Sequence, residues 1–407
     1  DDCLVLNVWS AVGSADAPVL VWLHGYVATG SGSGWSEGEA LARTCGVVVV
    51  TVNYRLSIFG HAADAEIPNV GLLDVVTALH WVSENIAAFG GDARNVTLGG
   101  VSAGAFRAAC VATSNRSKGL VSRLVLHSPL AVRPLTKCEA EERSAALQQH
   151  LGRDPRRDVP AMDIARAAAR AGPFLPVLDD DLVVDHPMEE LADGTTSRLP
   201  VVVGITRDEG FAFVTRVLDG SPLTDADVNA QCEDALGPAG LEILQRYRAL
   251  HPGSPPSEIA SELIAGVLFR RAAFRFLERR LDAQASGAGV VHAYEFAAAT
   301  NFVDRRPRTP HGFDVPFMFG NLAKVSIARG IPANRELSAT MGKRWSAFMR
   351  GQGPVDRAGP EWPAYGPERE WLTLGPEPVP SIVSDPRLVE RAMLIDGGDF
   401  NVASLVL

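Results

Sequence analysis

A serine flanked by glycines, at the junction between a strand and a helix, most constrains what this chain can fold into. The pentapeptide Gly100-Val101-Ser102-Ala103-Gly104 follows the β-prone run 95–99 and precedes the helix-prone run 105–112. A G-x-S-x-G turn of this kind is too sharp for large side chains two positions from the serine, and it raises Oγ above the sheet. The helix that follows directs its free N–H groups toward a developing oxyanion. In a chain with 38 glycines, the pattern can also be an ordinary turn, so partner residues must decide.

The composition is that of a soluble globular protein. Of the 407 residues, 46% are hydrophobic and 21% charged, which is enough for a large core, and no apolar run is long enough to span a membrane. A net charge of −10 without a basic stripe argues against a nucleic-acid surface. The five cysteines lack metal-ligand spacing, and we expect neither a metal nor another cofactor. The sequence starts at Asp1 and does not distinguish a cytoplasmic from a secreted protein, and it leaves the oligomeric state open.

Strands alternate with helices through the first 130 residues. This order predicts an α/β fold with a mostly parallel sheet covered on both faces. We expect one domain over 1–407, with helical insertions at 131–195 and 211–285 and loops with short strands on the surface at 352–386. The expected strands are 4–9, 18–23, 46–53, 95–99, 120–127, 199–204 and 290–296, and the expected helices include 39–44, 74–86 and 259–281.

A nucleophilic serine needs a base, and His311 is the candidate among nine histidines. It lies in a loop late in the chain, and in α/β-hydrolases the order is serine, then acid, then histidine. His292 is also late, but it lies within an expected strand, which favours a structural role. His127 stands at a strand end and is more typical of a packing or surface residue.

The acid that orients the base should follow a strand between Ser102 and His311. The run 201–210 supplies a strand followed by two adjacent carboxylates, Asp208 and Glu209, and spacing alone does not choose between them. The acidic run 179–181 is a competitor, although three consecutive charges usually mark a solvated loop.

Segments along nearly the whole chain resemble the type-B carboxylesterases, the family that includes the cholinesterases. The most specific is Asn85-Ile86-Ala87-Ala88-Phe89-Gly90-Gly91-Asp92, which is similar to the family's N-I-x-x-F-G-G-D. The other matching segments are 2–8, 21–25, 50–56, 208–210, the run from His311 through Asp314 to Gly320, and the scattered positions Trp345, Phe348, Gly351, Pro354 and Trp362-Pro363.

This resemblance implies the α/β-hydrolase fold and a Ser-His-Glu triad. It chooses Glu209 over Asp208, because the acid of the family is the glutamate of its D-E-G. The implied reaction is two-step acyl transfer to Ser102, with His311 as base and with backbone N–H groups of Gly25, Tyr26 and Ala103 forming the oxyanion hole.

The chain departs from the family next to the chemistry. The family's H-G-G-G-F loop is replaced by His24-Gly25-Tyr26-Val27, one residue shorter, and glycine is favoured there for close backbone approach. Two interpretations stay open: a repositioned loop that still forms an oxyanion hole, or a weakened hole with altered chemistry. Val101 replaces the family's glutamate beside the nucleophile, which makes cationic, choline-like substrates less favourable.

The beginning of the sequence also differs from the relatives. In the relatives, further residues precede the segment that matches 2–8. Those residues form edge strands of the sheet and include the cysteine that pairs with the counterpart of Cys3. We therefore expect a short family member in which Cys3 is a free thiol and a sheet edge is uncovered, at a cost in stability.

Three functions are compatible with these motifs and with the resemblance. The first is a carboxylic ester hydrolase acting on small neutral or apolar esters. The second keeps the triad but diverts it to lactone, carbamate or acyl-transfer chemistry. The third is a non-catalytic binding protein on the same fold, which the presence of Ser102, Glu209 and His311 disfavours.

Overall fold

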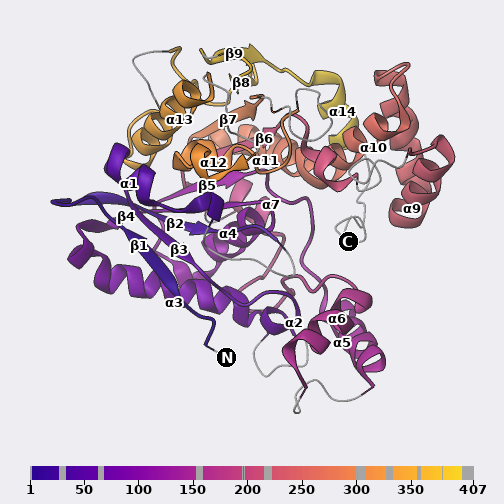
Figure 1. Ribbon diagram of the computed structural model, residues 1–407, viewed down its shortest axis with the longest axis horizontal. Helices are drawn as coiled ribbons and strands as arrows, with labels where there is room; N and C mark the ends of the chain where they lie inside the picture. The colour runs from indigo at the N-terminus through magenta and orange to yellow at the C-terminus, as the bar shows by residue number, and fades with distance from the viewer. Residues whose placement is uncertain are drawn as a thin grey trace.

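A nine-stranded sheet forms the centre of the part of the chain that the structure describes (Figure 1). The structure is a computed structural model and describes residues 2–26, 34–62, 68–152, 159–194, 196, 198–214, 222–298, 300, 308–326, 333–354, 359–377 and 379–396. The strand order is β1-β3-β2-β4-β5-β6-β7-β8-β9, antiparallel at the two outermost pairs and parallel between them. The strands are β1 (Leu6–Trp9), β2 (Ala17–Leu23), β3 (Val48–Val52), β4 (Gly91–Val101), β5 (Arg123–His127), β6 (Val201–Thr206), β7 (Val291–Phe296), β8 (Glu370–Leu374) and β9 (Ser381–Ser384).

The inner strands have apolar side chains on both faces. Every residue of β2, β3 and β6 is buried, and these strands consist mainly of valine, leucine and isoleucine. Continuous apolar runs are typical of parallel strands that are covered by helices on both sides. The predicted mostly parallel sheet is therefore confirmed.

Helices cover the two faces of the sheet and enclose two separate cores. The first core includes residues of α3, α4 and α11, and the second includes residues of α1, α12 and α13. Figure 1 shows α3 and α13 on opposite sides of the sheet. The helices are α1 (Glu39–Cys45), α2 (Ser57–Gly60), α3 (Val70–Asn85), α4 (Ala103–Thr113), α5 (Lys137–Leu151), α6 (Ala161–Ala171), α7 (Pro187–Asp193), α9 (Asp225–Leu250), α10 (Pro256–Ala265), α11 (Arg271–Asp282), α12 (Val315–Phe319), α13 (Ala333–Met349) and α14 (Leu388–Asp396).

Short 3₁₀ and π turns supplement these helices. The π-helical turn η5 joins α10 to α11, and the 3₁₀ turn η4 carries the first residues after β6. The short turns are η1 (Gly34–Ser36), η2 (Ile86–Phe89), η3 (Asn115–Ser117), η4 (Glu209–Phe213), η5 (Gly266–Arg270), η6 (Ala283–Ser286) and η7 (Leu322–Lys324).

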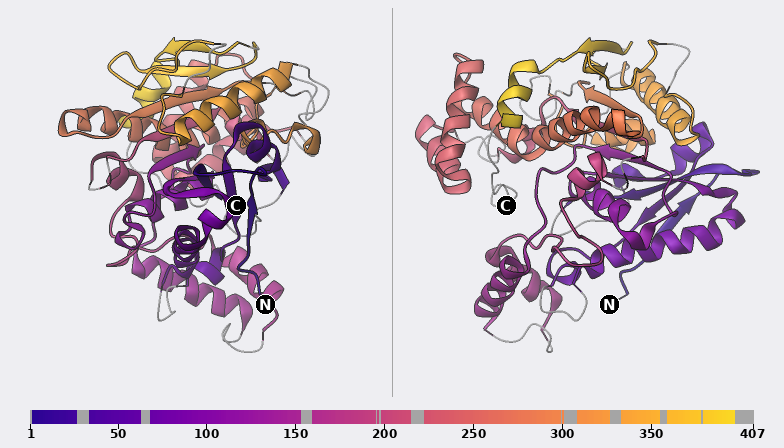
Figure 2. Two further views of the ribbon diagram at one scale, coloured as in Figure 1. Left: turned by 90° about the vertical axis from the view of Figure 1, so that its left-hand side faces the viewer. Right: turned by 180° about the vertical axis from the view of Figure 1, so that it is seen from behind.

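The two long connections at the centre of the chain are helical. Helices α5, α6 and α7 follow β5, and α9, α10 and α11 lie between β6 and β7. Helices α5 and α6 pack on each other and, with Ile58 of α2, enclose a small third core away from the sheet (Figure 2). These elements lie within the ranges predicted as insertions, and their status as insertions stays a prediction.

The segment 352–386 contains the expected short strands, β8 and β9, but it does not lie only on the surface. Trp362 and Trp371 are buried, and β8 pairs with β7 inside the sheet. The high proline and glycine content predicted a surface segment, but these two tryptophans pack into the cores. Among the described residues, no helix is long and apolar enough to cross a membrane.

Candidate active site

Ser102 lies at a strained turn between β4 and α4. Its backbone has φ 59° and ψ −127°, a conformation that non-glycine residues rarely adopt and that costs on the order of 1–3 kcal/mol. The glycines around it permit the turn. A Cβ on Gly104 would lie 2.3 Å from the Leu23 carbonyl oxygen, and one on Gly100 would lie 2.6 Å from the Gly104 backbone. The Ser102 N–H donates to the His127 carbonyl at 2.9 Å, which ties the turn to β5.

Glu209 is a fully buried carboxylate whose oxygens are both engaged. Oε1 accepts from the Ser128 hydroxyl at 2.5 Å and from the Thr206 N–H at 2.7 Å, while Oε2 lies 2.5 Å from His311 Nδ1. A carboxylate at Nδ1 fixes the ring orientation and leaves Nε2 as the basic atom. Because the donors at Oε1 hold the carboxylate in place, Glu209 can orient His311.

His311 is mostly enclosed by aromatic side chains. Its ring centroid is 4.2 Å from that of Phe269 and 5.5 Å from that of Phe213, and 14% of its side chain is exposed. A Cβ on Gly312 would lie 3.9 Å from Val101 Cγ2, so the loop of His311 packs beside the turn of Ser102. Three elements from distant parts of the chain therefore meet at the carboxyl edge of the parallel strands, where open α/β sheets bind their ligands.

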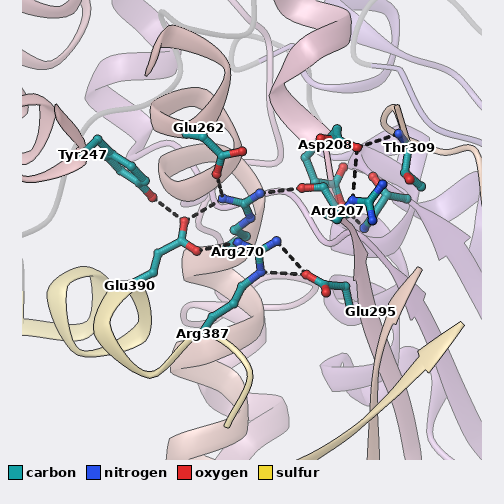
Figure 3. Close-up of polar contacts among 11 residues, drawn as sticks. Arg207, Asp208, Tyr247, Glu262, Arg270, Glu295, Thr309, Arg387 and Glu390 are labelled. Atoms are coloured by element: carbon teal, nitrogen blue, oxygen red, sulfur yellow. Dashed lines mark hydrogen bonds and ion pairs between the residues drawn. The ribbon is translucent and has the colours of Figure 1, made fainter. Parts of the chain in front are cut away.

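Asp208 joins the loops that carry Glu209 and His311. The Asp208 N–H donates to the Thr309 carbonyl at 3.0 Å, and the Thr309 N–H donates to Asp208 Oδ2 at 2.7 Å (Figure 3). Of the two adjacent carboxylates, Glu209 contacts the histidine, whereas Asp208 links the two backbones.

A buried ionic network lies beside this link (Figure 3). The fully buried Arg270 donates through Nη2 to the Arg207 carbonyl at 2.6 Å, and through Nη1 to Glu262 at 2.6 Å and Glu390 at 2.7 Å. Glu390 of α14 also accepts from the Tyr247 hydroxyl at 2.6 Å. The helix α14 is thereby connected to the backbone just before Asp208.

The residues after β2 lie against the serine. A Cβ on Gly25 would be 3.2 Å from the Val101 carbonyl oxygen and 3.4 Å from Ser102 Cβ. Tyr26 has φ 77°, the left-handed region that favours glycine, and it is 69% exposed. Val27 lies outside the described residues. Ala103 is the buried first residue of α4, immediately after Ser102.

A second histidine–carboxylate pair is buried beneath the first. His127 Nδ1 lies 2.9 Å from Asp314 Oδ2, and both side chains are fully buried. The Trp345 indole N–H donates to His127 Nε2 at 3.1 Å, and because an indole can only donate, Nε2 carries no proton. The Tyr294 hydroxyl also donates to Asp314 at 2.6 Å. His127 is thus a packed core residue, one of the two roles that its strand-end position predicted, and it fixes the loop of His311 to β5.

The other sequence candidates lie apart from this site. His292 is in β7, with Nδ1 3.0 Å from the Pro363 carbonyl, as its strand position predicted. Asp179 accepts from the backbone N–H groups of 181–183 and from Asn69, so it orders its own loop. Within the described ranges, no three His, Cys, Asp or Glu side chains are grouped as they would be to hold a metal ion.

Comparison with known proteins identifies the family. Residues 1–385 match the model of the carboxylesterase family. The para-nitrobenzyl esterase of Bacillus subtilis strain 168 is 34% identical over 436 aligned positions, covering 97% of this chain and 83% of the esterase. The phenmedipham hydrolase of Pseudarthrobacter oxydans is 29% identical, covering 90% of this chain and 77% of the hydrolase.

Solved structures give the same result. A structure of PNB esterase superposes with a TM-score of 0.82 at 33% identity, covering 97% of this chain and 83% of the other. The predicted α/β-hydrolase fold and the predicted esterase class are confirmed by these relatives. The chain belongs to the carboxylesterase family and is a carboxylic ester hydrolase on the α/β-hydrolase fold.

Proposed function

We propose that the protein hydrolyses small neutral or apolar carboxylic esters through an acyl-enzyme formed on Ser102. The observation that carries this proposal is the contact of 2.5 Å between Glu209 and His311, on a loop that packs beside the strained turn of Ser102. A serine, a histidine and a buried carboxylate in this relation are the parts that acyl transfer requires.

In the first step, Ser102 Oγ attacks the ester carbonyl carbon and His311 Nε2 accepts the hydroxyl proton. Glu209 stabilises the imidazolium that forms. The tetrahedral intermediate collapses as His311 returns the proton to the alcohol, which leaves. Water then attacks the acyl-enzyme by the same route, and the carboxylic acid is released with Ser102 regenerated.

The negative oxygen of the intermediate needs donors that are already in place. We assign this role to the backbone N–H groups of Gly25, Tyr26 and Ala103. A Cβ on Gly25 would lie 3.4 Å from Ser102 Cβ, so this backbone passes close to the serine, and Ala103 begins the helix whose positive end faces the serine. Loss of one donor in such a hole typically lowers the rate about 10²- to 10³-fold.

The surroundings support a neutral or apolar substrate. Phe213 and Phe269 pack on the base, and Val101 precedes the nucleophile. At position 101 a cationic substrate would find the aliphatic side chain of Val101 in place of the carboxylate that the family has there. The relative named para-nitrobenzyl esterase is consistent with an aromatic ester as substrate for this chain.

The proposal is tested by covalent labelling. A fluorophosphonate should modify Ser102, as read by mass spectrometry of the digested protein, and Ser102→Ala should not be labelled. The wild type should hydrolyse p-nitrophenyl acetate and butyrate faster than the corresponding choline ester. Folded protein without an adduct on Ser102 would sink the hydrolase mechanism. An adduct with turnover of a phenyl carbamate or a lactone, but of no simple ester, would favour the diverted chemistry.

A further inference from the structure

Three consecutive carbonyls in the segment beside Ser102 are each held by a different side chain. The His24 carbonyl accepts from the Tyr54 hydroxyl at 2.6 Å, and the Gly25 carbonyl lies 2.7 Å from His24 Nδ1. The Tyr26 carbonyl accepts from Arg107 Nη1 at 2.9 Å. Burial lowers the pKa of His24 to about 4, so at neutral pH the ring carries one proton, on the nitrogen that faces Gly25.

These contacts hold both peptide planes that meet at Tyr26. The φ and ψ angles of a residue are the rotations between its two neighbouring planar peptides. His24 anchors the plane that contains the Gly25 carbonyl and the Tyr26 N–H, and Arg107 anchors the plane that contains the Tyr26 carbonyl. The unfavourable φ of 77° at Tyr26 is therefore imposed from both sides.

Arg107 is an unusual donor for this purpose. It is 1% exposed, and its Nε and Nη2 have no hydrogen-bond partner among the described residues, although buried arginines normally pair with carboxylates. Its guanidinium carbon lies 5.5 Å from the centre of the Tyr54 ring, and Tyr54 is itself the donor to His24. Within the described part of the chain, this buried charge therefore directs its hydrogen bond to the Tyr26 carbonyl.

Helix α4 places Arg107 and the nucleophile in a fixed relation. The helix begins at Ala103, directly after Ser102, and Arg107 lies one turn further along it. Gly104, on the same helix, contacts the Leu23 and His24 carbonyls closely enough to exclude any Cβ. One rigid element therefore carries Ser102 and also holds the segment proposed to stabilise the charge that Ser102 creates.

We propose that Arg107 is a positioning residue of the oxyanion hole: its hydrogen bond to the Tyr26 carbonyl holds this non-glycine residue in the backbone conformation that directs N–H groups toward the oxyanion. The inference rests on the proposed function, because it concerns the donors assigned there. It explains how a tyrosine serves at a place where close backbone approach favours glycine.

The role predicts a specific kinetic effect. The hole acts on charge that exists in the transition state and not in the bound ester. Arg107→Met should lower kcat for p-nitrophenyl acetate about 10- to 100-fold and leave KM within about threefold, less than the loss of a complete donor. The affinity for a trifluoromethyl ketone analogue, which forms an oxyanion on Ser102, should fall by a similar factor.

The Tyr26→Gly variant distinguishes a positioning role of Arg107 from a general loss of stability. Glycine adopts a positive φ readily, so it depends less on an anchor. In Tyr26→Gly protein, Arg107→Met should lower kcat by a clearly smaller factor than in wild type, a non-additivity that a loss of stability alone does not produce. If Arg107→Met does not fold, Arg107→Lys, which keeps one donor and the charge, is compared in the same two backgrounds.

Arg280→Met is the matched control. Arg280 is also buried, donates to one backbone carbonyl, that of Leu199 at 2.9 Å, and has Nε and Nη1 without partners among the described residues. Leu199 precedes the amino end of β6, at the opposite edge of the sheet from Ser102. Arg280→Met should lower the Tm and leave kcat unchanged.

The outcomes separate this inference from the proposed function. Wild type that neither reacts with a fluorophosphonate nor hydrolyses p-nitrophenyl acetate contradicts the proposed function. Active wild type with an unchanged kcat in folded Arg107→Met overturns the positioning role. An equal loss of kcat from Arg107→Met in the wild-type and Tyr26→Gly backgrounds overturns it as well.

Discussion

Asp208 and Thr309, which lie 101 residues apart in the chain, exchange two hydrogen bonds and thereby fasten the loop of Glu209 to the loop of His311. His311 Nδ1 is contacted by Glu209 and not by this pair. The relative position of the proposed acid and base therefore depends on a neighbouring pair that takes no part in the proton transfer.

Removing this link should impair turnover. Asp208→Ala leaves the Thr309 N–H without its acceptor, which costs about 1–3 kcal/mol where the group is buried and loosens the base loop. We expect kcat/KM to fall about 10-fold or more, measured with p-nitrophenyl butyrate. Asp208→Asn, whose amide oxygen still accepts, should retain most of the activity. If Ala and Asn behave alike, the hydrogen bond is not what matters.

Loss of the Glu209 carboxylate should lower activity far more than loss of the Asp208 carboxylate. Glu209→Gln keeps the size of the side chain but removes the charge opposite the imidazolium, and in Ser-His-acid triads such a change lowers kcat about 10³- to 10⁴-fold. Ser128→Ala removes one of two donors at Oε1, and we expect a loss of about 10-fold. Steady-state kinetics on the two variants checks the order, and a Glu209→Gln enzyme within about 10-fold of wild type is incompatible with the triad.

Glu390 should make the fold sensitive to acid. Burial opposes its ionisation, but Arg270 and Arg387 outweigh burial and lower its pKa to about 2. A carboxyl whose pKa is lower in the folded state stabilises the fold above its unfolded pKa, and this contribution disappears as the pH falls from about 5 to about 2. Glu390→Gln should reduce the free energy of unfolding at pH 7 by about 3–5 kcal/mol, because it leaves buried arginines short of a charge partner.

The measurement for Glu390 is urea unfolding across this pH range. The free energy of unfolding of Glu390→Gln should depend less on pH than that of wild type, because in wild type Glu390 loses its charge on acidification. Glu368, which is exposed, supplies the control: Glu368→Gln should unfold like wild type at every pH. Parallel wild-type and Glu390→Gln curves would contradict the assignment of the acid sensitivity to Glu390.

Thiol reactivity should divide the five cysteines. All are free thiols in the structure, with Cys3 and Cys138 exposed and Cys110 and Cys232 buried. Nearby Glu142 raises the pKa of Cys138, so less of it is thiolate at pH 7 and it should react more slowly than Cys3. A disulfide-exchange reagent should titrate two thiols rapidly in native protein and five in denaturant, and Cys3→Ser should remove the faster one. A protein with no fast thiol would contradict the exposure of Cys3.

Much of the fold was predictable because its signals are local. The valine run at 47–50, the helical period in 75–86 and the glycines around Ser102 each determine a conformation over a few residues. Boundaries were less accurate: β4 begins at Gly91 and α3 at Val70, both earlier than the sequence predicted. These ends depend on pairing with strands and helices elsewhere, which a single segment does not encode.

The contacts within the site were predictable only in part. Spacing left Asp208 and Glu209 equivalent, and family resemblance chose Glu209, the residue that contacts His311. The contact of Arg107 with Tyr26 joins residues 81 positions apart, and the pairing of His127 with Asp314 spans an even longer stretch of the chain. Such pairs form only when distant strands and helices pack together, so no local pattern in the sequence predicts them.

Four of the eight described non-glycine residues with positive φ lie along one edge of the sheet. Tyr26, Ser57, Ser102 and Ser128 lie beyond the carboxyl ends of β2, β3, β4 and β5, respectively. The strands β2 to β5 are thus each followed by a strained residue on the side where chemistry is proposed, although Asp16 and Arg369 carry positive φ just before β2 and β8 on the other side. For protein engineering, this means that the two edges are not equivalent. We expect stabilising substitutions at the amino ends of these strands to leave the proposed catalytic geometry intact, and relief of strain at the carboxyl ends to exchange activity for stability.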